Sequence, residues 1–149
     1  MRTKLTIYFL FLSVLFAQFS IAEEKFLSLK KNKVNVRYGP SFDSKIKYIY
    51  KKINLPIKQI DKKENFRRIV DLKNNSGWIH ISQLKKSNSI IILEDRILFK
   101  KSSNLSVPIA RLEKGRLLVI KKCENKWCSI ITGNYSGWVK AEKIWGSIK

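Results

Sequence analysis

Several residue types on which enzyme chemistry depends are scarce in this chain of 149 residues. It has two cysteines, one histidine and eleven acidic residues, and the acids are scattered along the sequence. General acid–base catalysis and a tetrahedral metal site both need such side chains in groups. A sustained helical period of apolar residues is also missing. We therefore expect a β protein with no catalytic residue, no metal site and no cofactor.

Acidic residues are scarce relative to basic ones. The chain has 31 lysines and arginines against 11 acids, a formal net charge of +20. Such a charge favours anionic partners, namely nucleic acid, acidic lipid or an anionic wall polymer. Lysine outnumbers arginine, and isoleucine and asparagine are abundant, a mix that an AT-rich coding bias also produces. The sequence leaves open whether the charge is functional or compositional.

The first 22 residues have the order of a secretory signal. Two basic residues precede an apolar core at Leu5–Phe16, and Ser20-Ile21-Ala22 places small residues before a cleavage point. An uncleaved anchor is the alternative, although the core is shorter than the ~20 apolar residues of a full span. We expect a signal peptide over 1–22, a mature chain from Glu23, and a periplasmic or secreted location.

One short phrase occurs twice, as Ser76-Gly77-Trp78-Ile79 and as Ser136-Gly137-Trp138-Val139. Each copy follows alternating apolar residues. A glycine there suits a tight turn with positive φ, and the tryptophan then opens a strand and offers a large surface for burial. Repetition at this interval predicts two similar small β domains.

Short alternating segments separated by turn residues fill both halves of the chain. Asp61–Asn65 and Ser76-Gly77 are expected in turns, Phe26–Leu29 as an added edge strand, and Ile90–Leu93 as a strand packed between the two units. The short linker Lys85–Ser89 predicts that the units touch. The expected strands are 34–37, 46–50, 57–60, 66–72 and 78–81, closed by a 3₁₀ turn at 82–84, and then 96–99, 109–112, 117–122, 127–132 and 138–140 with a closing segment at 141–144.

Several motifs follow one another along the chain, namely Val34–Ser41, Leu55–Ile57, Phe66–Asp71 and Gly77–Ile79, then Cys123, Trp127-Cys128, Gly137–Val139 and Trp145-Gly146. These motifs resemble the bacterial SH3-like (SH3b) family. The resemblance implies an all-β fold class, with two tandem small SH3-like barrels at 30–86 and 90–146 after the signal peptide. It also implies a binding module of the cell envelope without a known reaction. Two departures stand out, because Phe66 replaces the usual tryptophan and the second half lacks the Arg-x-Gly-Pro loop.

If ligands bind at the Gly39-Pro40 loop, only the first repeat retains the site. The expected ligand-binding residues are Arg37, Tyr38, Phe42 and Trp78, around a shallow groove. Arg37 can pair with a carboxylate bidentately or can instead brace the loop, and Trp78 can instead be a core or rim residue. The expected partner is peptidoglycan peptide or an envelope protein segment. The alternative is charge-only recognition of anionic lipid, polymer or nucleic acid, of which nucleic acid is disfavoured.

Cys123 and Cys128 are the only cysteines. If Asn125-Lys126 forms a two-residue turn, they face each other as a non-hydrogen-bonded pair, where side chains come closest. Export makes oxidation to a disulfide the expected outcome. Free thiols, or a metal site joined by His80, are the alternatives. A Cys–His nucleophile pair is disfavoured because His80 belongs to the other repeat.

Overall fold

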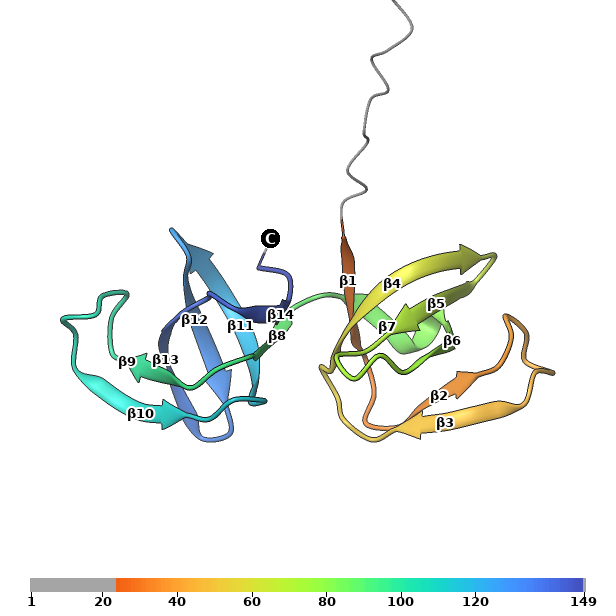
Figure 1. Ribbon diagram of the computed structural model, residues 1–149, viewed down its shortest axis with the longest axis horizontal. Coiled ribbons are helices and arrows are strands. Elements are labelled where there is room, and N and C mark those ends of the chain that lie inside the picture. Colours follow the sequence, from red (N-terminus) through yellow and green to blue (C-terminus); the bar gives the residue numbers. More distant parts are fainter. Residues whose placement is uncertain (1–23, 149) are drawn as a thin grey trace, which may run out of the picture.

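The computed structural model describes residues 24–148, so the expected signal peptide lies outside the described residues. The chain forms two small all-β units that lie next to each other and are joined by a short connection (Figure 1). Each unit is an antiparallel sheet of seven strands. Within residues 24–148, no helix is long and apolar enough to cross a membrane.

The two sheets have the same strand order. The first is β3-β2-β6-β5-β4-β1-β7 and the second is β10-β9-β13-β12-β11-β8-β14, so each strand has a counterpart seven places later. This repetition confirms the predicted fold class of two tandem barrels. The strands are β1 Lys25–Leu29, β2 Val34–Arg37, β3 Ile46–Tyr50, β4 Pro56–Lys63, β5 Phe66–Val70, β6 Ser76–His80, β7 Leu84–Lys86, β8 Ser89–Ile92, β9 Arg96–Phe99, β10 Pro108–Leu112, β11 Leu117–Glu124, β12 Trp127–Thr132, β13 Tyr135–Lys140 and β14 Ile144–Gly146, with a 3₁₀ turn at Ile81–Gln83.

The first strand of each barrel differs from the sequence-based expectation. β1 is not an edge strand, because it pairs with both β4 and β7. β8 does not lie between the units as a separate strand, since it occupies the same place in the second sheet, between β11 and β14. All four residues of β8 are buried. A strand covered on both faces lacks the alternation by which a half-buried strand is recognised.

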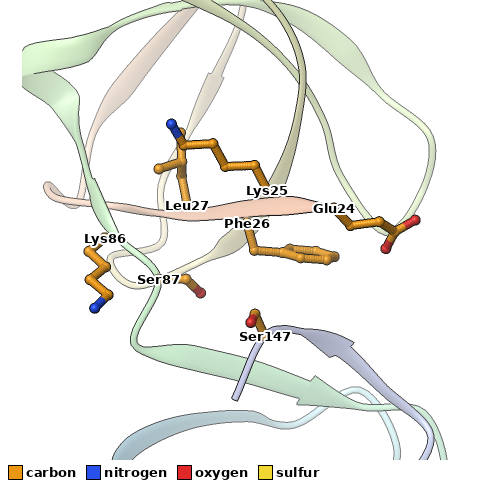
Figure 2. A pocket seen from close by; sticks show the side chains of 7 residues that line it. All are labelled: Glu24, Lys25, Phe26, Leu27, Lys86, Ser87 and Ser147. Atoms are coloured by element: carbon orange, nitrogen blue, oxygen red, sulfur yellow. The ribbon is translucent and has the colours of Figure 1, made fainter. Parts of the chain in front are cut away.

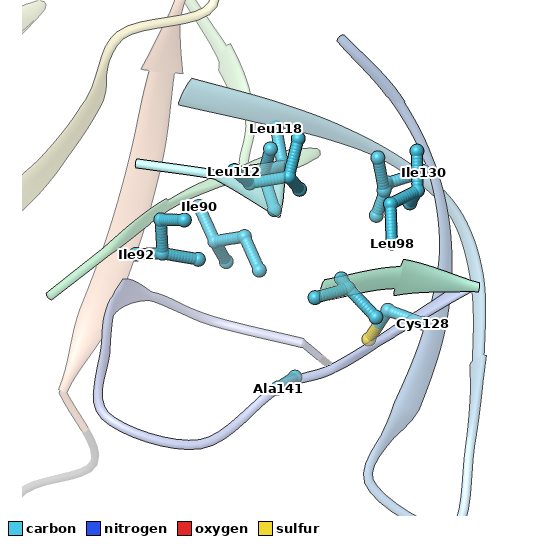
Figure 3. Close-up of a cluster of buried hydrophobic side chains, with 9 residues drawn as sticks. Ile90, Ile92, Leu98, Leu112, Leu118, Cys128, Ile130 and Ala141 are labelled. Carbon is cyan, nitrogen blue, oxygen red and sulfur yellow. The ribbon is translucent and has the colours of Figure 1, made fainter. Parts of the chain in front are cut away.

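Each barrel has its own apolar core. Seven buried side chains fill the first and nine the second. Figure 3 shows the second cluster, in which residues of β8, β9 and β11 meet Cys128 and Ile130 of β12. The first core contains Leu29, Val34, Val36, Ile57, Ile69, Ile79 and Leu84, and the second contains Ile90, Ile92, Leu98, Leu112, Leu118, Cys128, Ile130, Val139 and Ala141.

The repeated glycine does not lie in a turn, as we expected. Gly77 and Gly137 are inside strands β6 and β13. A Cβ at Gly77 would stand 2.3 Å from Cγ1 of Val36, and one at Gly137 would stand 2.6 Å from the carbonyl oxygen of Phe99. The glycine is therefore needed because the neighbouring strand crosses there too closely to admit a side chain.

The long hairpins β4–β5 and β11–β12 also correct one prediction. The expected charged turn at Asp61–Asn65 is mostly strand, since β4 continues to Lys63. Both hairpins contain a register shift at the same place, between Gln59 and Asp61 in one and between Ile120 and Lys122 in the other. The residues beyond the shift are mostly exposed, so their polarity indicated a turn although the backbone is paired.

The predicted disulfide is confirmed at the end of the second hairpin. Cys123 and Cys128 are cross-strand partners with Cα atoms 4.1 Å apart, and their sulfur atoms are bonded. The intervening Asn125 and Lys126 both have positive φ, 47° and 67°. This is the backbone of a type I′ two-residue hairpin turn.

The barrels contact each other, as the short linker predicted. The ring of Phe26 in β1 meets Trp145 in β14 edge-on, with centroids 5.2 Å apart. The Trp145 Nε1 donates to the carbonyl oxygen of Pro56 at 2.9 Å. The hydroxyls of buried Ser28 and Ser89 are 2.8 Å apart, and the Ser89 hydroxyl also donates to the carbonyl oxygen of Asn54.

Candidate functional site

The loop that follows β2 is held in place by Arg37. Its Nη1 donates to the carbonyl oxygens of Phe42 at 2.9 Å and Ser44 at 2.7 Å. Arg37 therefore does brace the Gly39-Pro40 loop, one of the two roles that the sequence left open. The guanidinium also lies 5.7 Å from the centroid of the Phe42 ring. A cation near an aromatic face adds a modest attraction to the two hydrogen bonds.

Phe42 projects from this loop over the rings of Phe66 and His80 in the first barrel. Its ring centroid lies 5.2 Å from that of Phe66 and 4.8 Å from that of His80. Phe42 is nevertheless 62% exposed, whereas Phe66 beneath it is buried. An exposed aromatic ring anchored on two others offers apolar surface to a ligand at little cost in conformational entropy.

Trp78 lies between two arginines on the same face. It pairs with Arg37 of β2 on one side and with Arg68 of β5 on the other. Directly opposed residues of neighbouring antiparallel strands share one face of a sheet. The strand order therefore places a row of guanidinium, indole and guanidinium across β2, β6 and β5. We call the residues Arg37, Phe42, Arg68 and Trp78 the outer face.

Tyr38 is the predicted site residue that lies apart from the others. It follows Arg37 in the chain, is 67% exposed, and has Lys47 Nζ 5.6 Å from its ring centroid. The ring of Tyr38 thus contacts a side chain of β3 rather than the outer face. Of the four predicted residues, the structure brings together Arg37, Phe42 and Trp78. It places the ring of Tyr38 beside Lys47 of β3.

The second barrel lacks this arrangement. Trp138 pairs with Phe99 and Ser129, which stand where the first barrel has its two arginines. Phe99 packs against Trp127 with centroids 5.8 Å apart, and Lys122 Nζ lies 5.2 Å from the centroid of Trp138. Trp138 is thus flanked by Phe99, which packs on Trp127, and by Ser129, and the Lys122 side chain lies over its ring. The first barrel has an arginine on each side of the tryptophan instead.

Sequence reasoning missed Arg68 and His80 as members of the site region. The role of Arg68 could not be predicted because it depends on the pairing of β5 with β6, which the local sequence pattern does not determine. The available signal was the two-residue period within Phe66–Val70, which places residues 66, 68 and 70 on one face. His80 was interpreted as a strand surface residue, and its Nδ1 lies 2.8 Å from the Ser82 hydroxyl.

A carboxylate at the margin of the first core stabilises the hairpin that precedes β6. Asp71 Oδ1 accepts from the backbone amides of Lys73 and Asn75, each at 2.9 Å. Its Oδ2 accepts from the hydroxyl of Tyr50 at 3.0 Å. Burial, followed by the hydrogen bond to Tyr48, raises the pKa of Tyr50 far above its usual value. The pKa of Tyr48 is raised as well, chiefly by burial.

A second depression lies between the barrels. Figure 2 shows Phe26 projecting from β1 toward the segment that carries Ser147. The cavity there has a volume of about 550 Å³ and is lined by Glu24–Leu27, Lys86, Ser87 and Ser147. Because Phe26 lines this cavity and also packs against Trp145 of the second barrel, the cavity belongs to the junction of the two barrels.

Comparison with known proteins agrees with this architecture. A sequence profile described as the bacterial SH3 domain matches residues 30–86 and 101–146, most of the described chain. The chain belongs to the bacterial SH3 domain family. Both bacterial SH3 segments fall within one barrel each, and the first includes the whole outer face. No curated protein matches the sequence.

Two solved structures from Trichomonas vaginalis are similar in part. They are described as NlpC2 and NlpC1, each 11% identical to this chain, with TM-scores of 0.39 and 0.38. The match covers 83% and 86% of this chain, and 48% of either neighbour. The bacterial SH3 chain therefore spans about half the length of each.

Proposed function

We propose that this protein is an exported, non-catalytic binding module of the cell envelope, in which the outer face of the first barrel binds a carboxylate-bearing peptide. Membership of the bacterial SH3 family supports a binding role. The observation that carries the proposal is the row Arg37–Trp78–Arg68, which the second barrel replaces with Phe99, Trp138 and Ser129.

The chemistry of the outer face suits an anionic peptide. Arg68 offers a planar fork of donors that matches a carboxylate. Arg37 holds the loop with one nitrogen and presents its charge beside Phe42. Trp78 and Phe42 supply aromatic surface on which apolar parts of the ligand can pack. The ligands that fit are peptidoglycan stem peptide and an acidic segment of an envelope protein.

A non-catalytic role is supported by the state of the reactive side chains. Cys123 and Cys128 are joined in a disulfide, so neither is a thiolate nucleophile. His80, the single histidine, is engaged with Ser82. Among residues 24–148, no three side chains of histidine, cysteine, aspartate or glutamate gather into a group that could hold a metal ion.

The alternative function is recognition of anionic lipid, polymer or nucleic acid through charge alone. The formal net charge of +20 favours it. The two functions differ in their response to salt. Charge-only binding falls steeply as the salt concentration rises, whereas a site with aromatic and hydrogen-bond contacts retains part of its affinity.

The test is a pull-down of isolated envelope material at increasing salt, with the wild-type protein and two variants of equal net charge. Arg68→Ser gives that position the residue of the second barrel, Ser129, and Lys121→Ser removes an exposed charge elsewhere. We expect the Arg68 variant to lose captured peptide at moderate salt and the Lys121 variant to keep it. Equal losses in both variants would favour charge-only binding.

Export has its own test. Intact mass of the protein recovered from the cell envelope or the medium should correspond to a chain that begins at Glu23. A membrane-bound form that retains Met1 would contradict this part of the proposal and leave the binding site unaffected.

A further inference from the structure

The two barrels also differ at one end, beside the long hairpin β4–β5. In the first barrel this end contains a cavity of about 270 Å³ whose lining includes Leu27, Gln59, Arg67, Lys85 and Lys86. We call these five residues the barrel-1 end. Arg67 points to the face of β5 opposite to Arg68, because neighbouring residues of a strand alternate. The cavity is therefore separate from the outer face.

The second barrel has apolar side chains and a disulfide at the equivalent end, around a cavity of about 350 Å³ whose lining includes Ile120, Cys123 and Ile148. Strand register makes Gln59 equivalent to Ile120, and Arg67 equivalent to Cys128. Cys128 is completely buried and bonded to Cys123, and both belong to or pack on the second core. The half-buried amide and guanidinium of the first barrel thus stand where the second barrel has isoleucine and a disulfide.

The second end is also covered by the chain itself. Ile148, two residues after β14, packs against the second core. The corresponding residue of the first barrel is Asn88, two residues after β7. Its backbone amide donates to the hydroxyl of Ser28, and the chain continues from there into β8. The linker leads away to the next barrel, so among residues 24–148 the segment after β7 does not cover the first end as Ile148 covers the second.

Within residues 24–148, the barrel-1 end contains one buried acceptor without a hydrogen bond and three basic side chains. The Gln59 Oε1 atom is buried and accepts no hydrogen bond within residues 24–148. Arg67 is fixed by donation from Nη1 to the carbonyl oxygens of Glu64 and Phe66. Within the same part of the chain, neither Arg67 nor Lys85 nor Lys86 forms an ion pair with a carboxylate.

These groups define the chemistry of a complementary ligand. A ligand with an N–H donor would satisfy the buried Gln59 Oε1 atom, since leaving an acceptor unpaired costs free energy. A cluster of cations without a facing acid calls for an anion, and the guanidinium favours a carboxylate. Leu27 and the buried Leu84 add apolar surface. The cavity lies just below the size range of drug-sized ligands, so it suits a small group.

We propose that the barrel-1 end binds the C-terminal residue of a peptide. The terminal carboxylate contacts Arg67 and Lys85, the last amide N–H donates to Gln59 Oε1, and a small apolar side chain packs on Leu27. Ile148 on the second barrel is the intramolecular counterpart, an apolar residue that packs on the second core beside Ile120 and Cys123. This site is additional to the outer face and does not depend on it.

The experiment uses two matched probes, acetyl-alanyl-alanine with a free carboxylate and the same peptide as its C-terminal amide. Binding to the isotope-labelled protein is followed by NMR titration. We expect saturable shifts at Gln59, Arg67 and Lys85 with the acid, and at least about tenfold weaker binding of the amide. Probes of D- and L-alanine distinguish a wall peptide from a protein C-terminus, and a preference for either supports the site.

Arg67 and Arg68 lie on opposite faces of β5, so substituting each in turn distinguishes the two sites. Arg67→Lys and Gln59→Ile should each weaken the acid probe several-fold, and Lys85→Gln provides a further variant, at a half-buried position outside the core, should the others disturb folding. If instead Arg68→Lys weakens the probe, or its shifts map to Trp78, the carboxylate binds the outer face, and this inference fails while the proposed function stands. Equal affinity for acid and amide would also overturn it.

Discussion

The indole nitrogen of Trp145, in the last strand of the second barrel, donates a hydrogen bond to the carbonyl oxygen of Pro56 in the first. The same ring packs on Phe26. One side chain thus supplies both a polar and an aromatic contact across the junction. We expect Trp145→Ala to leave each core intact while the barrels reorient independently, and to lower interface stability by about 2 kcal/mol. Separate rotational correlation times by NMR relaxation would check it, with Trp127→Ala as a comparison inside one barrel.

Gly77→Ala should prevent the first barrel from packing. The new Cβ would meet Cγ1 of Val36 at 2.3 Å and the carbonyl oxygen of Arg37 at 3.0 Å. Relief requires β2 and β6 to move apart, so we expect a loss of at least about 3 kcal/mol. Gly115→Ala is the control, since nothing lies within 4 Å of its Cβ and the cost is only that of its positive φ, roughly 1 kcal/mol. Denaturant unfolding that shows equal losses would refute the steric explanation.

The disulfide should stabilise the second barrel alone. Without reductant, the denatured protein should yield no free thiol. Reduction should lower the unfolding free energy of the second barrel by about 2 kcal/mol, the chain-entropy value for so short a loop. The first barrel, which has Lys62 and Arg67 at the equivalent cross-strand positions, should melt as before. Detection of two titratable thiols per chain would contradict the prediction.

Two aromatic substitutions should separate binding from stability. Tyr38→Ala removes a ring that is 67% exposed, so we expect an unchanged melting temperature. If Tyr38 contacts the ligand, affinity should fall roughly five- to thirtyfold. Phe99→Ala should instead cost the second barrel about 2 kcal/mol, because its ring packs on Trp127. Melting curves and affinity for captured envelope peptide provide the measurements; a Tyr38 variant that binds normally removes that residue from the site.

Stability of the first barrel should fall at high pH. Burial raises the pKa of Tyr50 in the folded state, while the unfolded chain releases that proton near pH 10. The stabilisation is therefore fully present below about pH 10 and is lost as the pH rises above that value. We expect Tyr50→Phe to lose the hydrogen bond to Asp71 at neutral pH but to show a weaker alkaline decline. Thermal melts across the alkaline range would reveal an unchanged slope if Tyr50 were not responsible.

Local features of the fold were predictable from the sequence and long-range contacts were not. The disulfide followed from spacing, because a two-residue turn fixes which residues face each other. The repeated glycine was assigned to a turn, because its true constraint is the approach of Val36 and Phe99 from other strands. The positions of β1 and β8 in the sheets were predicted wrongly, because each pairs with a strand on both sides and neither partner is its neighbour in the sequence. Arg37 and Trp78 were found through the resemblance, whereas Arg68 needed the register of β5 against β6.

The placement of the entering and leaving strands has a mechanical consequence. β1 brings the chain into the first barrel, β7 takes it out, and the two are antiparallel neighbours, with Leu27 opposite Lys86. β8 and β14 repeat this arrangement in the second barrel. Tension applied along the chain therefore loads these hydrogen bonds in sequence from one end, like a zipper, rather than all at once in shear. A protein held between two anchored partners would open at its terminal strands under low force, one barrel before the other.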